Sequence, residues 1–543
     1  MASFQTHLSL LESRTAQYPS LPVLKVPQQT LTGVSWKNIT LPQFQRDVEA
    51  SARYWAHQFS QKGFKERSVV GIWLKGLSYL DLTHIWGIAR AGFIPQPISL
   101  RMTDPTVMYE LLSRTNAVAL IHDPSFKSFL SNSPVPIWPG EEIPTSDVEL
   151  PLPNLWMPSQ DSDIIMIYHT SGSTMGTPKL VPVTARWLDY TIGKMNYFIP
   201  SPPSSKRQQV IVAGGSFCHM ASTVILIGSI GRGGSMVLPS HQPYTTGDLR
   251  QMIDDCELTV LNMFSTFLSK VLDKARGDPA LLAALEGLDY IVYSGLPLGV
   301  VDETWGREQG LKLFNCFACT EVGIMMQSFG GRAEDQPHFV TLAKSARYEF
   351  IPVSDDSASS GKLLELVVPP ESPDCPAPPL RNQKDGKFYT GDLFMEISPG
   401  QYLSKGRNDD WIKMESAMRC DTGSIERNAM QTCGDDLVDA AVVVGARRPS
   451  PVLMVEPKDG VIIKAEDKLS QLKNEILQRV TPFHKRRYLH ERIDDTQFIL
   501  VVPKGSLPRT VTKGNIQRKK AEESFKEELD KIYSASRLPV NGR

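Results

Sequence analysis

Small hydroxyl residues and glycines gather in one short segment of the chain, residues 169–179, which reads HTSGSTMGTPK. Backbone N–H groups and hydroxyls in such a loop can converge on one point, and the closing lysine adds a positive charge there. A polyphosphate fits this set of donors. Because the same residue types dominate ordinary surface turns, the loop considered alone leaves both interpretations open. The candidate phosphate-binding residues are His169, Thr170, Ser171, Gly172, Ser173, Thr174, Gly176 and Lys179.

Four later segments also carry polar side chains at close spacing: 315–321 (NCFACTE), 389–392 (YTGD), 404–413 (SKGRNDDWIK) and 507–518 (LPRTVTKGNIQR). Each is weak alone, since a Thr-Glu pair is typical of a buried helix start and Thr-Gly-Asp of a turn. Glu321 carries a carboxylate, the ligand type that a hard cation bridging phosphates prefers.

The order of these segments resembles the signature set of the adenylate-forming enzymes, which include acyl-CoA synthetases, luciferases and the adenylation domains of peptide synthetases. In that family the loop runs from threonine directly to glycine, so Met175 is an additional residue here. The family's glycine after the lysine is replaced by Leu180. Five signatures in register along nearly the whole chain favour the resemblance over chance.

The resemblance implies a role for each matched residue. Phe317 would stack on adenine, Thr320 would bond the α-phosphate and Glu321 would hold Mg²⁺. Asp392 would accept hydrogen bonds from both ribose hydroxyls, and Arg407 would reach the nucleotide. Further nucleotide-binding residues implied by the family pattern are Ser294, Gly295, Asn315, Cys316 and Ala318.

The last of the five segments is similar to the part of the family sequence that carries the adenylation lysine. The usual order is Gly-Lys-Ile, whereas an asparagine lies here between Gly514 and Ile516. Lys513 is therefore the candidate catalytic cation, with Lys179 and Thr320 as the other candidate catalytic residues. Fungal reductases and peptide-synthetase-like enzymes of the superfamily commonly carry Lys-Gly-x-Ile/Val-Gln-Arg, which points to that subgroup.

Weaker signals indicate the acid-binding pocket. Amino-acid-activating domains would place an aspartate directly after Phe217, where this chain has Cys218. Because an uncompensated ammonium in an apolar pocket is costly, we expect an aryl, fatty or keto acid and not an α-amino acid. Phe217, Met263 and Phe264 would give this pocket an apolar or aromatic lining. His219 is either a substrate-binding residue or a core histidine with satisfied hydrogen bonds, and both interpretations stay open.

Composition bounds the class of protein. A length of 543 residues with 41% hydrophobic residues predicts more than one domain with large cores. The net charge of −1 argues against nucleic acid or an anionic membrane surface as the main partner. We recognise no secretory signal and no apolar run that could span a bilayer. Seven scattered cysteines fit a reducing compartment, so we expect a cytoplasmic protein.

Strand-like and helix-like patterns alternate along most of the chain, for example a helix at 41–59 and strands at 69–74 and 164–168. Alternation of this kind predicts βαβ units and a largely parallel sheet. The proline-rich stretch 369–379 is expected to be a surface connection. A helix at 517–533 is expected to present a solvated face.

With the resemblance, these patterns predict an α/β protein of the adenylate-forming fold. We expect a large N-terminal α/β domain at 1–405, a hinge at 406–409 and a small, mobile α+β C-terminal domain at 410–543. Asp409 is the expected hinge residue, since it would absorb the change in backbone conformation as the small domain turns.

The resemblance implies ATP- and Mg²⁺-dependent conversion of a carboxylic acid to an acyl adenylate, followed by transfer to a thiol. CoA is the first expectation for that thiol. One alternative is an adenylation unit that loads the phosphopantetheine of a carrier protein, either in trans or as part of a longer reductase. A third, from another class, is a nucleotide-binding regulator that has lost catalysis.

Overall fold

A mixed sheet of 13 strands is the largest element of the computed structural model, which describes residues 4–31, 33–99, 105–143, 149–170, 178–198, 207–328, 339–343, 345–353, 363–408, 411–415, 419–460, 466–485, 487, 491–510 and 514–536. Its strands follow the order β16-β17-β18-β19-β15-β14-β13-β12-β11-β9-β10-β1-β2. Six neighbouring strands in the middle of this order run parallel to one another. They are β13 (Leu313–Cys319), β12 (Tyr290–Ser294), β11 (Val260–Phe264), β9 (Val210–Val212), β10 (Ser235–Val237) and β1 (Pro22–Thr30).

Antiparallel strands complete this sheet on both sides of the parallel part. At one edge β2 (Gly33–Thr40) pairs with β1. Beyond β13 the sheet continues through β14 (Gly323–Gln327), β15 (Phe339–Leu342), β19 (Gln401–Arg407), β18 (Phe388–Ser398), β17 (Leu364–Val368) and β16 (Glu349–Pro352). The sheet is thus less parallel than the sequence pattern predicts, because among the described residues no α-helix lies between these strands in the sequence.

Two smaller sheets lie in the same N-terminal part of the chain. The first is parallel and has the order β4-β3-β5-β6, with β4 (Ile94–Pro97), β3 (Val69–Trp73), β5 (Ala119–His122) and β6 (Ile137–Pro139). The second is an antiparallel pair, β7 (Ile164–His169) and β8 (Leu180–Thr184). The predicted strand at 164–168 is thereby confirmed.

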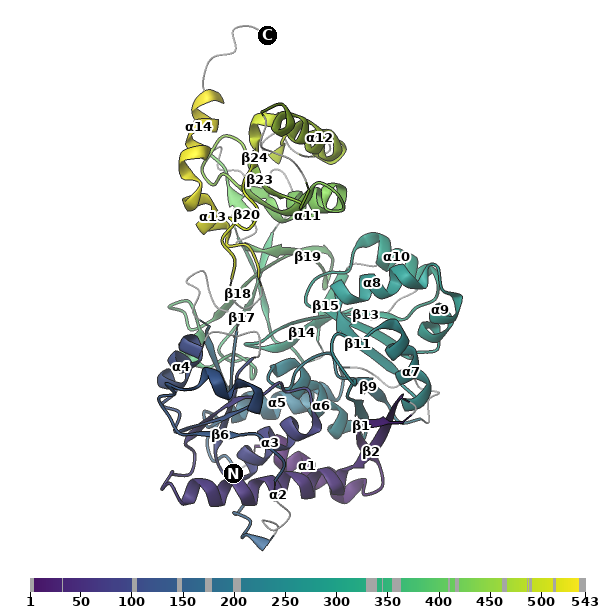
Figure 1. Ribbon diagram of the computed structural model, residues 1–543, viewed down its shortest axis with the longest axis vertical. Helices are drawn as coiled ribbons and strands as arrows, with labels where there is room; N and C mark the ends of the chain where they lie inside the picture. Colours follow the sequence, from purple (N-terminus) through teal and green to yellow (C-terminus); the bar gives the residue numbers. More distant parts are fainter. Residues whose placement is uncertain are drawn as a thin grey trace.

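Helices cover these sheets. They are α1 (His7–Gln17), α2 (Leu41–Ser60), α3 (Tyr79–Arg90), α4 (Pro105–Arg114), α5 (Ala185–Met195), α6 (Met220–Arg232), α7 (Thr246–Cys256), α8 (Ser265–Ala275), α9 (Pro279–Glu286) and α10 (Val300–Glu308). In Figure 1, α1, α2 and α3 lie together at the bottom of the view, and α7 to α10 lie at the right.

Helix α2 illustrates how local sequence produces an element. Thr40 caps it by accepting a hydrogen bond from the backbone of Gln43, and Pro42 occupies its first turn, where no N–H is needed. Its buried residues recur every three or four positions along one face. These are Leu41, Phe44, Val48, Ser51, Ala52, Trp55 and Phe59. The predicted helix at 41–59 is confirmed.

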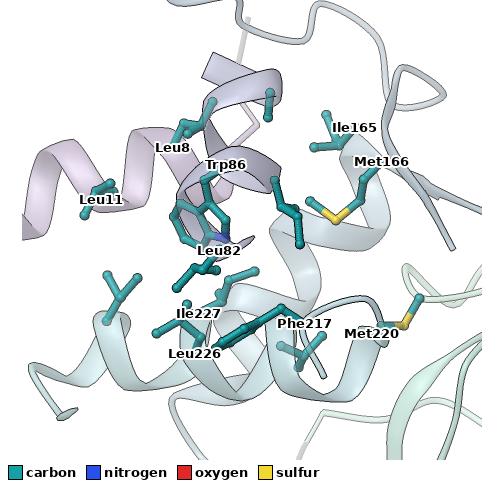
Figure 2. Close-up of a cluster of buried hydrophobic side chains, with 14 of the residues drawn as sticks. Leu8, Leu11, Leu82, Trp86, Ile165, Met166, Phe217, Met220, Leu226 and Ile227 are labelled. Carbon is teal, nitrogen blue, oxygen red and sulfur yellow. The ribbon is translucent and has the colours of Figure 1, made fainter. Parts of the chain in front are cut away.

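The main hydrophobic core lies where α1, α3, α6 and β7 meet. Figure 2 shows Trp86 of α3 between Leu8 and Leu11 of α1 and the side chains of α6, including Leu226 and Ile227. Helix α6 is apolar on nearly all sides, which is typical of a helix with no solvated face. This core holds the strand that leads into the 169–179 loop.

The C-terminal part forms a unit of its own, with its own hydrophobic core. It lies at the top of Figure 1, beyond β18 and β19. Its elements are β20 (Trp411–Lys413), β21 (Arg419–Asp421), α11 (Thr422–Cys433), β22 (Val438–Val444), β23 (Val452–Pro457), α12 (Glu466–His484), β24 (Ile499–Val501), α13 (Arg518–Ser524) and α14 (Lys526–Ser536).

Two expectations about connections and helix faces are wrong. The predicted helix at 517–533 is two helices, α13 and α14, and its face is not fully solvated, because Ala521, Leu529 and Tyr533 are buried. The proline-rich stretch is more than a surface connection, since Ser372 and Asp374 within it are fully buried. Within the described ranges, no helix combines the length and apolarity needed to cross a bilayer.

His7 makes the stability of the fold depend on pH. It is buried on α1, edge-on to Trp86 with ring centroids 4.7 Å apart, and burial lowers the pKa of His7 to about 3. An unfolded histidine binds a proton at about pH 6.5. Stability from this residue is therefore complete above that pH and is lost as the pH falls towards 3.

Replacing His7 with leucine should remove this loss. Between pH 8 and pH 5 the unmodified protein should lose about 2 kcal/mol of unfolding free energy through His7, and His7→Leu should lose correspondingly less. Urea unfolding at both pH values measures the difference. His57→Gln, on a less buried position of α2, is the control and should behave like the parent. An equal pH dependence in His7→Leu would contradict the assignment.

Candidate active site

The carboxyl ends of three neighbouring parallel strands form one wall of the site. In the register of the sheet, Phe264 of β11 pairs with Ser294 of β12, and Ser294 pairs with Cys316 of β13. Gly295 follows with φ of +90°, and a Cβ there would lie 3.1 Å from the Phe264 ring. The turn therefore needs glycine both for its backbone conformation and for the approach of the ring. Ligands of α/β sheets bind at such strand ends.

The NCFACTE segment continues this wall as strand β13 and not as a helix start. Phe317, predicted to stack on adenine, packs edge-on against Phe394 of β18, with ring centroids 5.1 Å apart. A register shift between Phe317 and Ala318 interrupts the pairing with β14. Thr320 and Glu321 form the half-buried turn that reverses the chain between the two strands. The ring contact places the segment beside β18.

The YTGD segment lies inside β18, where a simple turn was the alternative. Gly391 has φ of +76°, and the Arg407 guanidinium covers it, since a Cβ there would lie 2.8 Å from Nη2. Arg407 Nη1 donates to Asp392 Oδ1 at 3.2 Å and to the Thr390 carbonyl at the same distance. Asp392 and Arg407, predicted separately as nucleotide-binding residues, are thus an ion pair.

Two of the predicted carboxylates act on the same thiol. Exclusion from water raises the pKa of the Cys319 thiol well above its usual range, and the charges of Glu321 and then Asp392 raise it further. Glu321 and Asp392 come from different parts of the sheet, but both lie close enough to Cys319 to influence its thiol, and Arg407 balances the charge of Asp392. Carboxylates in this position suit a hard divalent cation or a cluster of hydroxyl donors.

The base of the 169–179 loop is closed by β7 and β8. The Thr170 N–H donates to the Lys179 carbonyl at 3.0 Å, and Arg114 donates to the Pro178 carbonyl at 3.0 Å. Lys179 itself is exposed. The remaining predicted loop residues lie outside the described ranges, namely Ser171, Gly172, Ser173, Thr174 and Gly176.

Ser99 joins two of the predicted histidines, although no sequence pattern singled it out. Its N–H donates to His169 Nε2 at 3.3 Å, and its hydroxyl lies 3.2 Å from His219 Nε2. Burial, followed by the nearby His219, lowers the pKa of His169 to about 4. His169 is therefore neutral at pH 7 and directs its acceptor nitrogen towards Ser99.

The residues proposed for the acid pocket separate into two groups. Phe217 and Met263 are buried in two different hydrophobic cores, whereas Phe264 is 43% exposed at the end of β11. His219 is exposed at the start of α6, which contradicts the alternative of a core histidine. Cys218 is buried, and burial raises the pKa of its thiol to about 12, so this position carries no charge at pH 7.

The two ends of the 507–518 segment, which is predicted to hold the catalytic lysine, pair with each other in the C-terminal unit. Arg509 pairs with Ile516 across it, and the Thr510 N–H donates to the Asn515 carbonyl at 2.8 Å. Buried Glu456 anchors it by accepting from the Leu507 N–H at 2.7 Å and by pairing with Arg509. Lys513 and the predicted hinge residue Asp409 lie outside the described ranges.

Two family models match the chain: an AMP-binding enzyme model over residues 13–346 and an AMP-binding enzyme C-terminal domain model over residues 409–537. The protein belongs to the AMP-binding enzyme family, and the resemblance found in the sequence is confirmed.

Known proteins of this family resemble the chain along its length. The AMP-binding domain-containing enzyme iboA of Amanita muscaria is 32% identical, over 93% of this chain and 98% of the relative. The adenylate-forming reductase Nps10 of Heterobasidion annosum is 23% identical over 86% of this chain, which spans only 44% of that relative. The solved O-succinylbenzoate coenzyme A synthetase MenE of Bacillus subtilis has a TM-score of 0.72 at 16% identity, covering 94% of this chain and 97% of its own. The predicted fold is thereby confirmed.

Gly391→Ala should test whether the Arg407 guanidinium lies over the YTGD backbone. We expect a loss of unfolding free energy of about 2–4 kcal/mol, because strain at positive φ adds to a clash with the ion pair. Thermal and urea unfolding measure it. Gly386→Ala is the matched control, with φ of +75° and no atom within 4 Å of the added Cβ. Equal losses in both variants would contradict the close contact.

Proposed function

We propose that the protein uses Mg·ATP to convert a carboxylic acid to an acyl adenylate, releases pyrophosphate and transfers the acyl group to a thiol. The observation that carries this proposal is one region of the sheet where two predicted carboxylates approach each other: the turn with Glu321 follows β13, and Phe317 of β13 packs on Phe394, two residues after Asp392. It lies beside the strand ends that hold Ser294 and Cys316. MenE, which shares the fold, has been solved with ATP and magnesium ion and with its acyl-adenylate intermediate.

Each carboxylate has a separate proposed role. Asp392, oriented by Arg407, would accept hydrogen bonds from the ribose hydroxyls. Glu321, on the turn after β13, would hold Mg²⁺, which supplies charge neutralisation on the phosphates when bound. Thr320 next to it would bond the α-phosphate, and exposed Lys179 at the end of the loop would meet the outer phosphates.

In the first step, a carboxylate oxygen attacks the α-phosphorus, and the bond from that phosphorus to the bridging oxygen of pyrophosphate breaks. In the second step, a thiol sulfur attacks the acyl carbon and AMP leaves. Neither step needs a covalent bond to the protein, so positioning and charge stabilisation supply the catalysis. Lys513 is the proposed cation for the first step.

We propose an aryl, fatty or keto acid as the substrate class. Cys218 is a buried neutral thiol where an amino-acid-activating enzyme would place its aspartate. Exposed Phe264 offers an aromatic surface at the strand ends, and His219, held by Ser99, offers a polar contact at the start of α6. An ammonium group would find no carboxylate partner among these described residues.

CoA is the proposed thiol, with the phosphopantetheine of a carrier protein as the alternative. The same fold in MenE, an O-succinylbenzoate coenzyme A synthetase, supports CoA as the thiol. The alternative is supported by Nps10, a reductase more than twice the length of the matched region. We also propose that residues 406–409, with Asp409 as the pivot, let the 410–543 domain turn between the two steps.

Pyrophosphate exchange across a panel of aryl, fatty, keto and α-amino acids tests the first step. Exchange with members of the first three classes but not the last is the expected result. A thioester assay with CoA and the accepted acid then tests the second step. Exchange without CoA acylation would favour a carrier protein as acceptor, and absence of exchange with every acid would contradict the proposed activity.

Lys513→Ala should abolish acid-dependent pyrophosphate exchange, with a loss of about 100-fold or more, because a charge that stabilises the transition state is removed. The unfolding temperature should stay unchanged. Lys519→Ala and Lys520→Ala are matched controls on the exposed surface of α13 and should retain exchange. If either control loses exchange while Lys513→Ala retains it, the lysine has been wrongly assigned.

A further inference from the structure

Lys194 and Asp374 form a buried ion pair next to β14, the strand that follows the Glu321 turn. Lys194 Nζ on α5 is 2.7 Å from Asp374 Oδ2 in the proline-rich stretch, and the side chains are 3% and 0% exposed. Ser372 donates to Asp374 Oδ1 at 2.6 Å, and the Tyr348 hydroxyl donates to Oδ2. Both charges are thus compensated by partners from separate segments, as burial of an ion pair requires.

Lys194 also holds the strand that follows the Glu321 turn. Its ammonium donates to the Ile324 carbonyl at 2.7 Å, and Ile324 pairs with Ala318 across the β13–β14 hairpin. About two turns earlier on the same face of α5, Trp187 packs on Gly323, where a Cβ would lie 3.2 Å from the indole. Helix α5 therefore fixes the start of β14, and with it the turn, at two points.

Asp374 connects α5 to β18, the strand that carries Asp392. The segment around it packs into the core formed by β17 and β18, where Cys375 lies with Phe388 and Phe394. Phe394 is two residues after Asp392 and contacts Phe317. A second link from α5 is the hydrogen bond from Arg186 to the Glu371 carbonyl at 2.8 Å.

We propose that Lys194 and Asp374 are positioning residues for nucleotide binding, which set the Glu321 turn relative to the Asp392 strand. Helix α5 follows β8 directly, so the same pair also connects both carboxylates to the base of the 169–179 loop. Binding of a ligand that contacts the Glu321 turn, the Asp392 strand and the base of the loop at once depends on their relative placement. Binding of a ligand that contacts only one of them depends on it less. This inference rests on the proposed function, because it concerns the same nucleotide.

Titration calorimetry of the full chain with AMP and with Mg·ATP tests the proposal. Lys194→Met should raise the Kd for Mg·ATP by about tenfold or more, and the Kd for AMP by a clearly smaller factor. A residue with only a structural role would lower the unfolding temperature without changing the ratio of the two Kd values. Absence of Mg·ATP binding by the unmodified protein would contradict the proposed function itself.

Lys194→Met leaves Asp374 as a buried charge, so a second variant separates stability from positioning. Lys194→Met combined with Asp374→Asn removes both charges and keeps an acceptor for the Tyr348 hydroxyl. It should unfold at a higher temperature than Lys194→Met alone while the change in the Kd ratio persists. This variant also decides the question if the single variant does not fold.

Arg307→Met is the matched control. Arg307 pairs with Glu303 at 2.8 Å, with side chains 6% and 1% exposed, and both residues of this buried ion pair belong to one helix, α10. It should lose stability with an unchanged ratio of the two Kd values. The same change in ratio in Arg307→Met, or an unchanged ratio in both Lys194 variants, would overturn the positioning role.

Discussion

Reversal of the chain between β13 and β14 is the constraint on which the rest of the site depends. The neighbouring strands from β1 to β13 are parallel, so their carboxyl ends lie at one edge of the sheet. The strands on the far side of β13 are antiparallel. The reversal leaves Thr320 and Glu321 at that edge. It also allows β18 to return along the same sheet, so that Asp392 reaches the neighbourhood of Cys319. Gly323, with φ of +81° under Trp187, makes the reversal possible.

Buried electrostatics give the site a defined charge pattern. His169 and Cys218 are held neutral by burial, while Asp392 and Arg407 form an ion pair at its border. Neutral walls beside a charged border suit a ligand with an apolar acyl end and a polyphosphate end. This division is the physical basis for assigning acid recognition and nucleotide recognition to different residues.

Several features of the fold and the site could be predicted from local sequence. The apolar residues of α2 recur with helical spacing, and β7 is a short β-branched run. Each pattern of apolar residues therefore indicates which element forms when those residues are buried. The polar segments at 315–321 and 389–392 were recognisable because they resemble known signatures in order. The individual roles of their residues stay predictions, and so do the domain limits at 405 and 410.

Other features had no local signal. Ser99 is an ordinary serine in the sequence, and it links His169 to His219 only because the ends of β4 and β7 lie together. The sequence predicts an exposed connection for the proline-rich stretch, because turn residues describe the backbone and not what the backbone packs against. Its burial depends on Lys194, 180 residues away.

The amino-acid sequence by itself determined the class of fold, the family and the set of polar residues, since short-range spacing and residue type encode them. The tertiary structure alone decided which of these residues share a charge environment. The pairing of Asp392 with Arg407, the convergence of Glu321 and Asp392 on Cys319 and the tie from Lys194 to Asp374 all join segments distant in sequence. Burial from water distinguishes the Lys194–Asp374 pair from the half-exposed Arg407 side chain, and both kinds of contact exist only once the chain has packed.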